Sequence, residues 1–218
     1  MQTHLTALLF LLPLLSNALP AQNSSPNPNL QTRAQKETQL TPKQIETIAP
    51  KSKSCESASS KDECATAAQA APAISASFDK YKVHSRAEQA AVIGLMAFES
   101  EEFQYNRNHS PGVPGKGTRN MQSPTYNQKY ASSLPDIADA AEQASSDADK
   151  VLDLLVDKTE YDFGSGAWFL TTQCGDDVRK QLQSGSEKGW KAYIRDCVGT
   201  EANRERRGYW ERAVDALG

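Results

Sequence analysis

The segment that most constrains the fold is the apolar run AEQAAVIGLMAFES at residues 87–100. Its composition favours a helix, and Ser85 followed by Glu88 has the spacing of a capping box, so the helix is predicted to begin at Ser85. On that helix Glu99 lies four residues after Leu95 and shares its apolar face. The pattern therefore predicts a carboxylate that points toward the core at the end of a helix.

A carboxylate in this position is a candidate general acid. Burying it among apolar groups raises its pKa, and a general acid must hold its proton near neutrality. Spacing alone does not decide the assignment, because Glu102 also fits near the same face. A structural role, with Glu99 bound to an arginine such as Arg119, is the alternative. Glu101 and Glu102 are expected to form a solvated rim, with assistance in catalysis as the less favoured reading.

The loop after this helix, PGVPGKGTRNMQ at residues 111–122, contains three glycines beside Lys116. The spacing of a phosphate-binding P-loop is absent, so the glycines are better explained by tight turns that let the backbone approach a ligand. Amide and aromatic side chains suited to hydrogen bonding and stacking lie in or next to this loop: Tyr105, Asn106, Asn120, Gln122 and Tyr126.

The order of these features resembles a known family. Glu99-Ser100 at the end of an apolar helix, then a Gly/Pro loop, then Met121-Gln122, is similar to the core of goose-type lysozymes and soluble lytic transglycosylases. The similarity covers roughly residues 89–126, and it is closer still to secreted fungal lysozyme-like proteins. Glu101-Glu102 stand where that family usually has a small residue, and the family's later Tyr-Asn-x-Gly segment has no clear counterpart.

The resemblance implies a mostly α fold of the α+β lysozyme-like kind, with a small irregular or β-hairpin lobe beside the cleft. It implies a secreted glycoside hydrolase or lytic transglycosylase that cleaves β-1,4 bonds in peptidoglycan, with Glu99 as the catalytic general acid. The alternatives are a non-catalytic carbohydrate-binding or effector-like protein on the same fold, or an enzyme that cleaves chitin or chitosan. The predicted substrate-binding residues are Ser100, Asn106, Asn120, Met121, Gln122 and Tyr126.

The N-terminal part divides by composition. Residues 1–18 contain an apolar run and a small-x-small end, which predicts a signal peptide and a secreted protein. Residues 19–54 are rich in Pro, Gln, Asn, Ser and Thr, and are predicted to form a disordered linker. Residues 55–218 then form the domain. No other apolar run is long enough to span a membrane.

Four cysteines in a secreted chain predict two disulfides, for which three pairings exist. We favour the two local pairs, Cys55 with Cys64 and Cys174 with Cys197. No histidine has ligand spacing to a cysteine, so we expect no metal and no cofactor.

The remaining sequence is helical in pattern, and residues 134–155 are predicted to form two helices divided near Ser145-Ser146. The net charge of -3 and the pI of about 5.7 argue against a nucleic-acid partner. The expected partner is a polysaccharide, peptidoglycan or chitin-like, and the expected state is a monomer.

Overall fold

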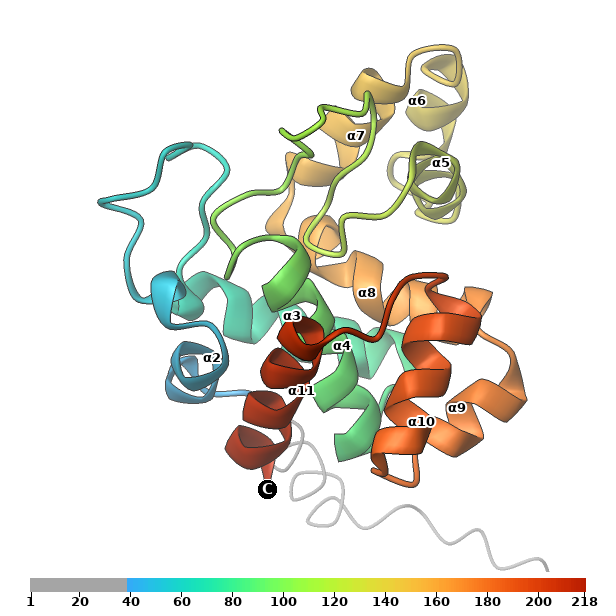
Figure 1. The fold of residues 1–218 in the computed structure, drawn as a ribbon. Helices are drawn as coiled ribbons and strands as arrows, with labels where there is room; N and C mark the ends of the chain where they lie inside the picture. The colour runs from blue at the N-terminus through green and yellow to red at the C-terminus, as the bar shows by residue number, and fades with distance from the viewer. Residues whose placement is uncertain (1–38) are drawn as a thin grey trace, which may run out of the picture.

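The computed structural model describes residues 39–218, which form helices joined by loops (Figure 1). The predicted signal peptide and the first part of the predicted linker lie outside the described residues. The helices, with the short 3-10 and π segments η1 and η2, are α2 (Pro42–Ile48), η1 (Pro50–Lys53), α3 (Ala67–Tyr81), α4 (Arg86–Glu99), α5 (Pro124–Ser132), α6 (Ala138–Gln143), α7 (Ala148–Val156), α8 (Thr159–Gln173), α9 (Asp176–Leu182), α10 (Glu187–Ala192), η2 (Tyr193–Cys197) and α11 (Arg204–Leu217).

The prediction of a mostly α fold is confirmed. Between residues 39 and 218 the β structure consists of isolated bridges that join Gly117 to Arg107 and to Gln122. The lobe beside the end of α4 is therefore irregular, and the β-hairpin alternative does not form. Figure 1 shows α5, α6 and α7 gathered at one end of the molecule, with α9 and α10 at the other.

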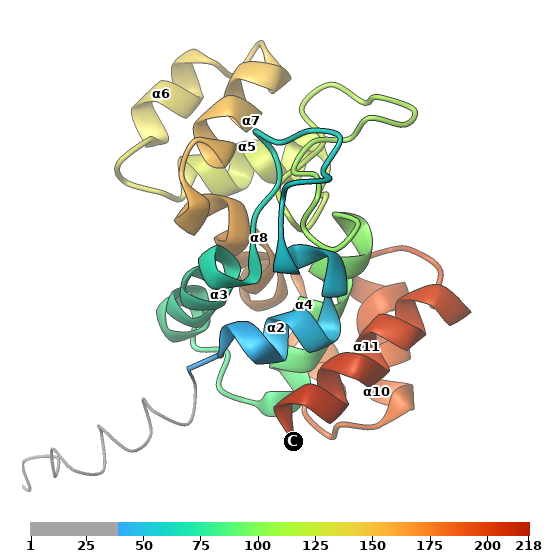
Figure 2. The same cartoon turned by 90° about the vertical axis from the view of Figure 1, so that its left-hand side faces the viewer.

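Helix α4 lies at the centre, and every residue from 88 to 97 in it is buried. It packs mainly against α11, while α8 packs mainly against α3 (Figures 1 and 2). The helix follows Ser85 as predicted, but the Ser85 side chain makes no capping hydrogen bond. The predicted capping box is wrong because Glu88 is turned into the protein, where its carboxylate accepts from Arg179 at 2.8 Å.

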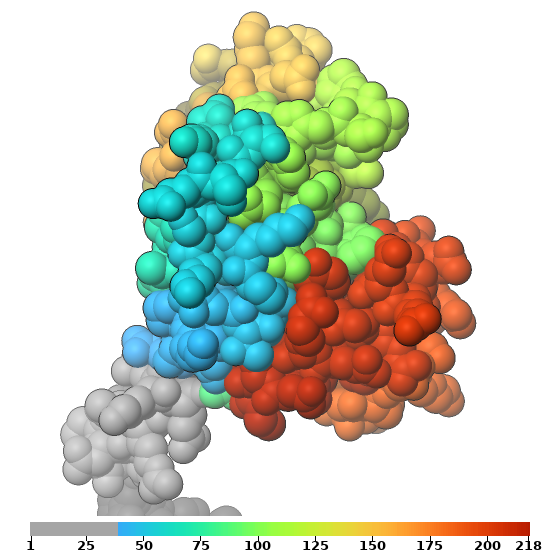
Figure 3. All heavy atoms as spheres, turned by 60° about the vertical axis from the view of Figure 1, so that its left-hand side comes forward, coloured from blue at the N-terminus to red at the C-terminus, as the bar shows by residue number. Residues whose placement is uncertain are grey.

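The linker prediction is wrong for residues 39–54, because this segment packs into the core. Thr41 and Gln44 form a capping box that starts α2. Ile45 and Ile48, three residues apart on one face, are fully buried, and α2 contacts both α11 and α3. In Figure 3 the blue atoms of the first described residues lie directly against the red atoms of the C-terminal part of the chain. The folded unit therefore begins before residue 55.

Both predicted disulfides are confirmed, Cys55 with Cys64 and Cys174 with Cys197. The predicted division of residues 134–155 is also confirmed, since α6 ends before residue 145 and α7 begins after residue 147.

One close helix contact positions the site and gives a testable prediction. A Cβ atom at Gly94 on α4 would lie 3.0 Å from the backbone of Trp210 on α11, whereas one at Gly208 on α11 would meet open space. We expect Gly94→Ala to lower the free energy of unfolding, because overpacking costs about 1–3 kcal/mol. Gly208→Ala should raise it by up to about 1 kcal/mol through helix propensity. Urea denaturation of the two variants checks this, and a stabilised Gly94→Ala would contradict the close packing.

Candidate functional site

A groove with a volume of about 820 Å³ opens at the end of α4. Its walls come from α4, from the loop at residues 100–123 and from α11. We call it the main groove and define it by Phe98, Glu99, Tyr105, Lys116, Met121 and Tyr209. Its volume lies in the range of about 300–1,000 Å³ that is usual for small-molecule sites.

The charges that line the main groove balance. Three are cationic and three are acidic: Lys51, Arg107 and Lys116 against Glu99, Glu101 and Glu205. Arg107 is paired with Asp153, and Lys51 lies 3.7 Å from Glu101. Within residues 39–218 the Lys116 ammonium has no ion pair, so it is the groove cation that is free to bind a ligand.

A second, smaller cavity of about 230 Å³ is also lined by Glu99. We call it the side pocket and define it by Glu99, Lys116, Asn120, Met121, Gln122 and Tyr126. Three of these residues also line the main groove, so the two cavities meet at Glu99. An apolar wall of the side pocket is the edge-to-face pair of Tyr126 and Phe169, whose ring centroids are 4.9 Å apart.

Glu99 is the last residue of α4 and forms an ion pair with Arg206 of α11. The guanidinium donates from Nε at 3.1 Å and from Nη2 at 2.8 Å to the same carboxylate oxygen, Oε1. Its Cζ atom also lies 4.4 Å from the centroid of the Phe98 ring. The structural alternative named an arginine partner for Glu99, but that partner is Arg206 and not Arg119.

Tyr193 lies fully buried on η2, and its hydroxyl has no hydrogen-bond partner within residues 39–218. Burial, together with the charge of Glu99, raises the pKa of this phenol. Tyr193 therefore keeps its proton and can act as a hydrogen-bond donor in the protein interior near Glu99.

The backbone turns sharply after α4. Glu101, Glu102 and Phe103 have consecutive φ values of 51°, 63° and 68°, and Met121 in the facing loop has a φ of 47°. A residue with a side chain costs about 1–2 kcal/mol in this left-handed region. Such strain persists only where the surroundings hold it in place, and it often occurs at ligand sites. This backbone strain is present in both loop segments beside Glu99, at residues 101–103 and at Met121.

Glu102 is held inside this turn. Its carboxylate accepts from the backbone N–H of Lys51 at 2.6 Å and from the hydroxyl of Tyr209 at 2.9 Å. The expectation of a solvated rim is thus wrong for Glu102, which is buried, although Glu101 is exposed. Burial and the Glu102 carboxylate raise the pKa of Tyr209 to about 12, so Tyr209 stays protonated at neutral pH.

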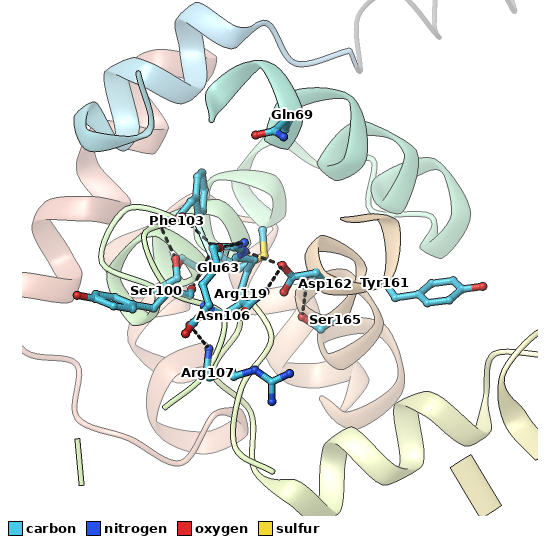
Figure 4. A network of polar contacts seen from close by, with 12 residues as sticks. Glu63, Gln69, Ser100, Phe103, Asn106, Arg107, Arg119, Tyr161, Asp162 and Ser165 are labelled. Atoms are coloured by element: carbon cyan, nitrogen blue, oxygen red, sulfur yellow. Dashed lines mark hydrogen bonds and ion pairs between the residues drawn. The ribbon is translucent and has the colours of Figure 1, made fainter. Parts of the chain in front are cut away.

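A buried polar network centred on Arg119 contacts the loop that follows α4 (Figure 4). Its Nε atom donates to Oδ2 of Asp162 at 2.7 Å, and its Nη1 atom donates to the carbonyls of Phe103 at 2.8 Å and Tyr105 at 3.1 Å. Its Nη2 atom donates to the carbonyl of Glu63. Arg119 therefore holds the loop after α4 against α8 and the Cys55–Cys64 loop.

Several buried polar atoms in this region have no hydrogen-bond partner among the described residues. They are Asn106 Oδ1, Thr118 Oγ1, Asn120 Oδ1, Gln122 Oε1, Asp162 Oδ1 and Tyr193 Oη. A buried unsatisfied group of this kind costs about 1–3 kcal/mol, and each one calls for an explanation such as a ligand or a water molecule. Two of them, on Asn120 and Gln122, belong to side chains that line the side pocket.

The structure brings together most, but not all, of the residues predicted from the sequence. Glu99 and Met121 line both cavities, and Asn120, Gln122 and Tyr126 line the side pocket. Ser100 and Asn106 line neither cavity. The Ser100 hydroxyl donates to the carbonyl of Met96 at 2.6 Å and accepts from the N–H of Phe103 at 3.0 Å, so it supports the turn. Binding of a ligand by the predicted residues stays a prediction.

Sequence reasoning missed Arg206 and Tyr209. They lie three residues apart on one face of α11 and supply the partners of Glu99 and Glu102. The spacing was visible in the sequence. What it could not show is that this face of α11 lies against the end of α4, more than 100 residues earlier in the chain.

No family model matches this chain, and no solved structure matches it. The chain is similar to a bifunctional dioxygenase (DOX)-epoxy alcohol synthase (EAS) from Fusarium oxysporum (strain Fo5176). The two are 49% identical over 156 residues, which cover 69% of this chain and 12% of the Fusarium protein. The chain thus spans about an eighth of the length of the curated relative it matches.

These comparisons contradict the resemblance to goose-type lysozymes and lytic transglycosylases. The relative they find is an enzyme named as a dioxygenase and epoxy alcohol synthase, and no lysozyme family model matches. The prediction of a glycoside hydrolase, with a general acid acting on peptidoglycan or chitin, is therefore wrong. The similarity rested on a short motif order, whereas the match to the Fusarium protein extends over 156 residues.

Residues 39–218 contain neither a metal-binding cluster nor a membrane-spanning helix. This part of the chain has no group of three or more His, Cys, Asp or Glu residues that could hold a metal ion. None of its helices combines the length and the apolar character needed to cross a bilayer.

Proposed function

We propose that this chain is a ligand-binding domain whose main groove takes an uncharged organic molecule with hydroxyl or ether oxygens on a carbon skeleton. The epoxy alcohol in the name of the Fusarium relative has this chemistry. Because the matched segment is about an eighth of that enzyme, we assign binding to this domain, rather than turnover by the dioxygenase or the synthase.

The composition of the main groove is the observation that carries the proposal. Phe98, Tyr105 and Tyr209 offer aromatic surface to a carbon skeleton. Because the cationic and acidic side chains of the main groove balance, a strongly charged ligand is disfavoured. The same side chains offer a ligand both hydrogen-bond donors and hydrogen-bond acceptors. The unpaired Lys116 ammonium can donate to an epoxide oxygen, which only accepts, and a hydroxyl can both donate and accept.

Calorimetric titration of the purified chain tests this proposal. We expect an epoxy alcohol to bind and the matching hydrocarbon without oxygens to bind much more weakly. Lys116→Met, which keeps the length of the side chain, should weaken binding by about tenfold, the size of one charge-assisted hydrogen bond. Lys61→Met is the matched control, because Lys61 is exposed and lines neither cavity.

Equal affinity of the wild type and Lys116→Met for the epoxy alcohol would contradict the assigned site. An oligomer of N-acetylglucosamine belongs in the same titration, because a polysaccharide partner stays a prediction. If that oligomer binds and the epoxy alcohol does not, the proposed ligand class is wrong.

A further inference from the structure

His109 and Glu63 form a hydrogen-bonded pair at the wall of the main groove. Nε2 of the imidazole lies 2.8 Å from Oε1 of the Glu63 carboxylate. The Glu63 side chain is 10% exposed and the His109 side chain is 51% exposed, so a buried acid holds a half-exposed ring. The His109 ring lines the main groove and also makes an edge contact with the Tyr105 ring, with centroids 5.1 Å apart. These two contacts fix the position of the imidazole.

The Glu63 carboxylate accepts every hydrogen bond that it makes. Its second oxygen, Oε2, accepts from the backbone N–H groups of Asn106 at 3.1 Å and of Arg107 at 3.2 Å. Glu63 and these two partners belong to the network in Figure 4. Because a carboxylate has no proton to donate, the hydrogen between Glu63 and His109 must belong to Nε2 of the imidazole.

The place of this proton decides what the other ring nitrogen can do. In a neutral imidazole one nitrogen carries the proton and the other is an acceptor, and the partner of one nitrogen sets the state of both. With the proton on Nε2, Nδ1 of His109 is an acceptor. Nδ1 points away from Glu63, and within residues 39–218 it has no hydrogen-bond partner. The groove wall therefore presents one uncharged acceptor in a fixed direction.

We propose that Nδ1 of His109 accepts the hydroxyl proton of the ligand, and that Glu63 positions His109 for this contact. The inference rests on the proposed function, because it concerns the ligand of the main groove. Lys116 lines the same groove and donates to the epoxide oxygen. The two residues thus contact the two oxygens of an epoxy alcohol in opposite roles, and the groove prefers a free hydroxyl group to an ether.

Calorimetric titration of the full chain compares an epoxy alcohol with its O-methyl ether, which has no hydroxyl proton to donate. The buffer is mildly alkaline, so that imidazole is neutral. We expect the wild type to bind the alcohol about tenfold more tightly than the ether. His109→Phe keeps an aromatic ring without the acceptor, so its preference for the alcohol should fall to nearly one.

Glu63→Gln moves the ring proton while it keeps the shape of the pair. The backbone N–H groups of Asn106 and Arg107 need an acceptor, so the amide oxygen takes the place of Oε2 and the NH₂ group faces His109. Nε2 must then accept, and the proton moves to Nδ1. Because a hydroxyl and an ether can both accept from Nδ1–H, the preference for the alcohol should disappear. We expect the ether to bind Glu63→Gln about tenfold more tightly than the wild type, a gain that damage to the groove cannot produce.

Nitrogen NMR of the ring gives a readout that needs no ligand, because it shows which ring nitrogen carries the proton. The signals that disappear in His109→Phe belong to His109. We expect the proton on Nε2 in the wild type and on Nδ1 in Glu63→Gln. Glu56→Gln is the matched control, because Glu56 is exposed in the same Cys55–Cys64 loop and lines neither cavity. It should change neither the preference nor the position of the proton.

The possible failures are distinguishable. If the wild type binds the alcohol and the ether equally well, if His109→Phe keeps the preference, or if the wild type carries the proton on Nδ1, the His109 contact is wrong while the proposed function stands. An unchanged preference in Glu63→Gln overturns the role of Glu63, and if that variant does not fold, His109→Phe and the wild-type spectrum still decide. If the wild type binds neither compound, the proposed function fails and the His109 contact fails with it.

Discussion

Replacing Arg119 with methionine is expected to lower the free energy of unfolding by about 3–5 kcal/mol at neutral pH, the usual effect of breaking a buried ion pair from one side. Asp162 would lose its guanidinium partner while both its side chain and the loop carbonyls stay buried. Urea denaturation at neutral pH measures the loss. The double variant Arg119→Met/Asp162→Leu is the control and should recover part of it, because no unpaired charge then remains.

The size of this loss should depend on pH. Burial raises the pKa of the Asp162 carboxyl, while Arg119 and Asn106 oppose the rise. Without Arg119 the pKa in the folded protein rises further. A carboxyl with a raised pKa favours folding most below its unfolded value of about 3.9, and this stability is lost as the pH rises through the folded pKa.

The difference between wild type and Arg119→Met is therefore expected to be smallest in acid and to grow toward neutral pH. Urea titrations of both proteins at a series of pH values give this difference directly. A difference that is constant with pH, or that grows toward acid, would contradict the role assigned to the buried pair.

Truncation of the buried face of α2 is the second large prediction. Ile45→Ala and Ile48→Ala should each lower the free energy of unfolding by about 2–5 kcal/mol, because both side chains are fully buried and would leave cavities. Thr47→Ala, on the exposed face of the same helix, should change it by no more than about 0.5 kcal/mol. Thermal and urea unfolding of the three variants checks this. A pair of silent isoleucine variants would restore the linker reading of this segment.

The sequence predicted those parts of the fold that depend on neighbouring residues. The helix that ends at Glu99 and the division before α7 follow from apolar spacing and local composition, and both are present. The two disulfides were found because each joins cysteines that are close in the chain. Neighbouring residues largely determine such features, so they could be predicted without knowledge of the tertiary packing.

Features that depend on distant residues could not be predicted in the same way. The segment at residues 39–54 has the composition of a linker, and only its contacts with α3 and α11 show that Ile45 and Ile48 are buried against the rest of the protein. Glu102 was expected at a solvated rim, because no helix rule anticipates three left-handed residues in succession. The partner of Glu99 lies on α11, far away in the sequence.

The functional prediction failed for a different reason. It rested on a short order of common residue types around Glu99 and Met121-Gln122, which unrelated proteins can share. The site that these residues form is nonetheless present as two cavities that meet at Glu99. Ligand binding by these residues stays a prediction.

Crystals of this chain grown with an epoxy alcohol provide the most direct measurement of the central claim. We predict difference density in the main groove, with the carbon skeleton against Phe98 and Tyr209 and an oxygen within hydrogen-bonding distance of Lys116. Density at another surface, or an empty groove at a saturating concentration of the compound, would contradict the account.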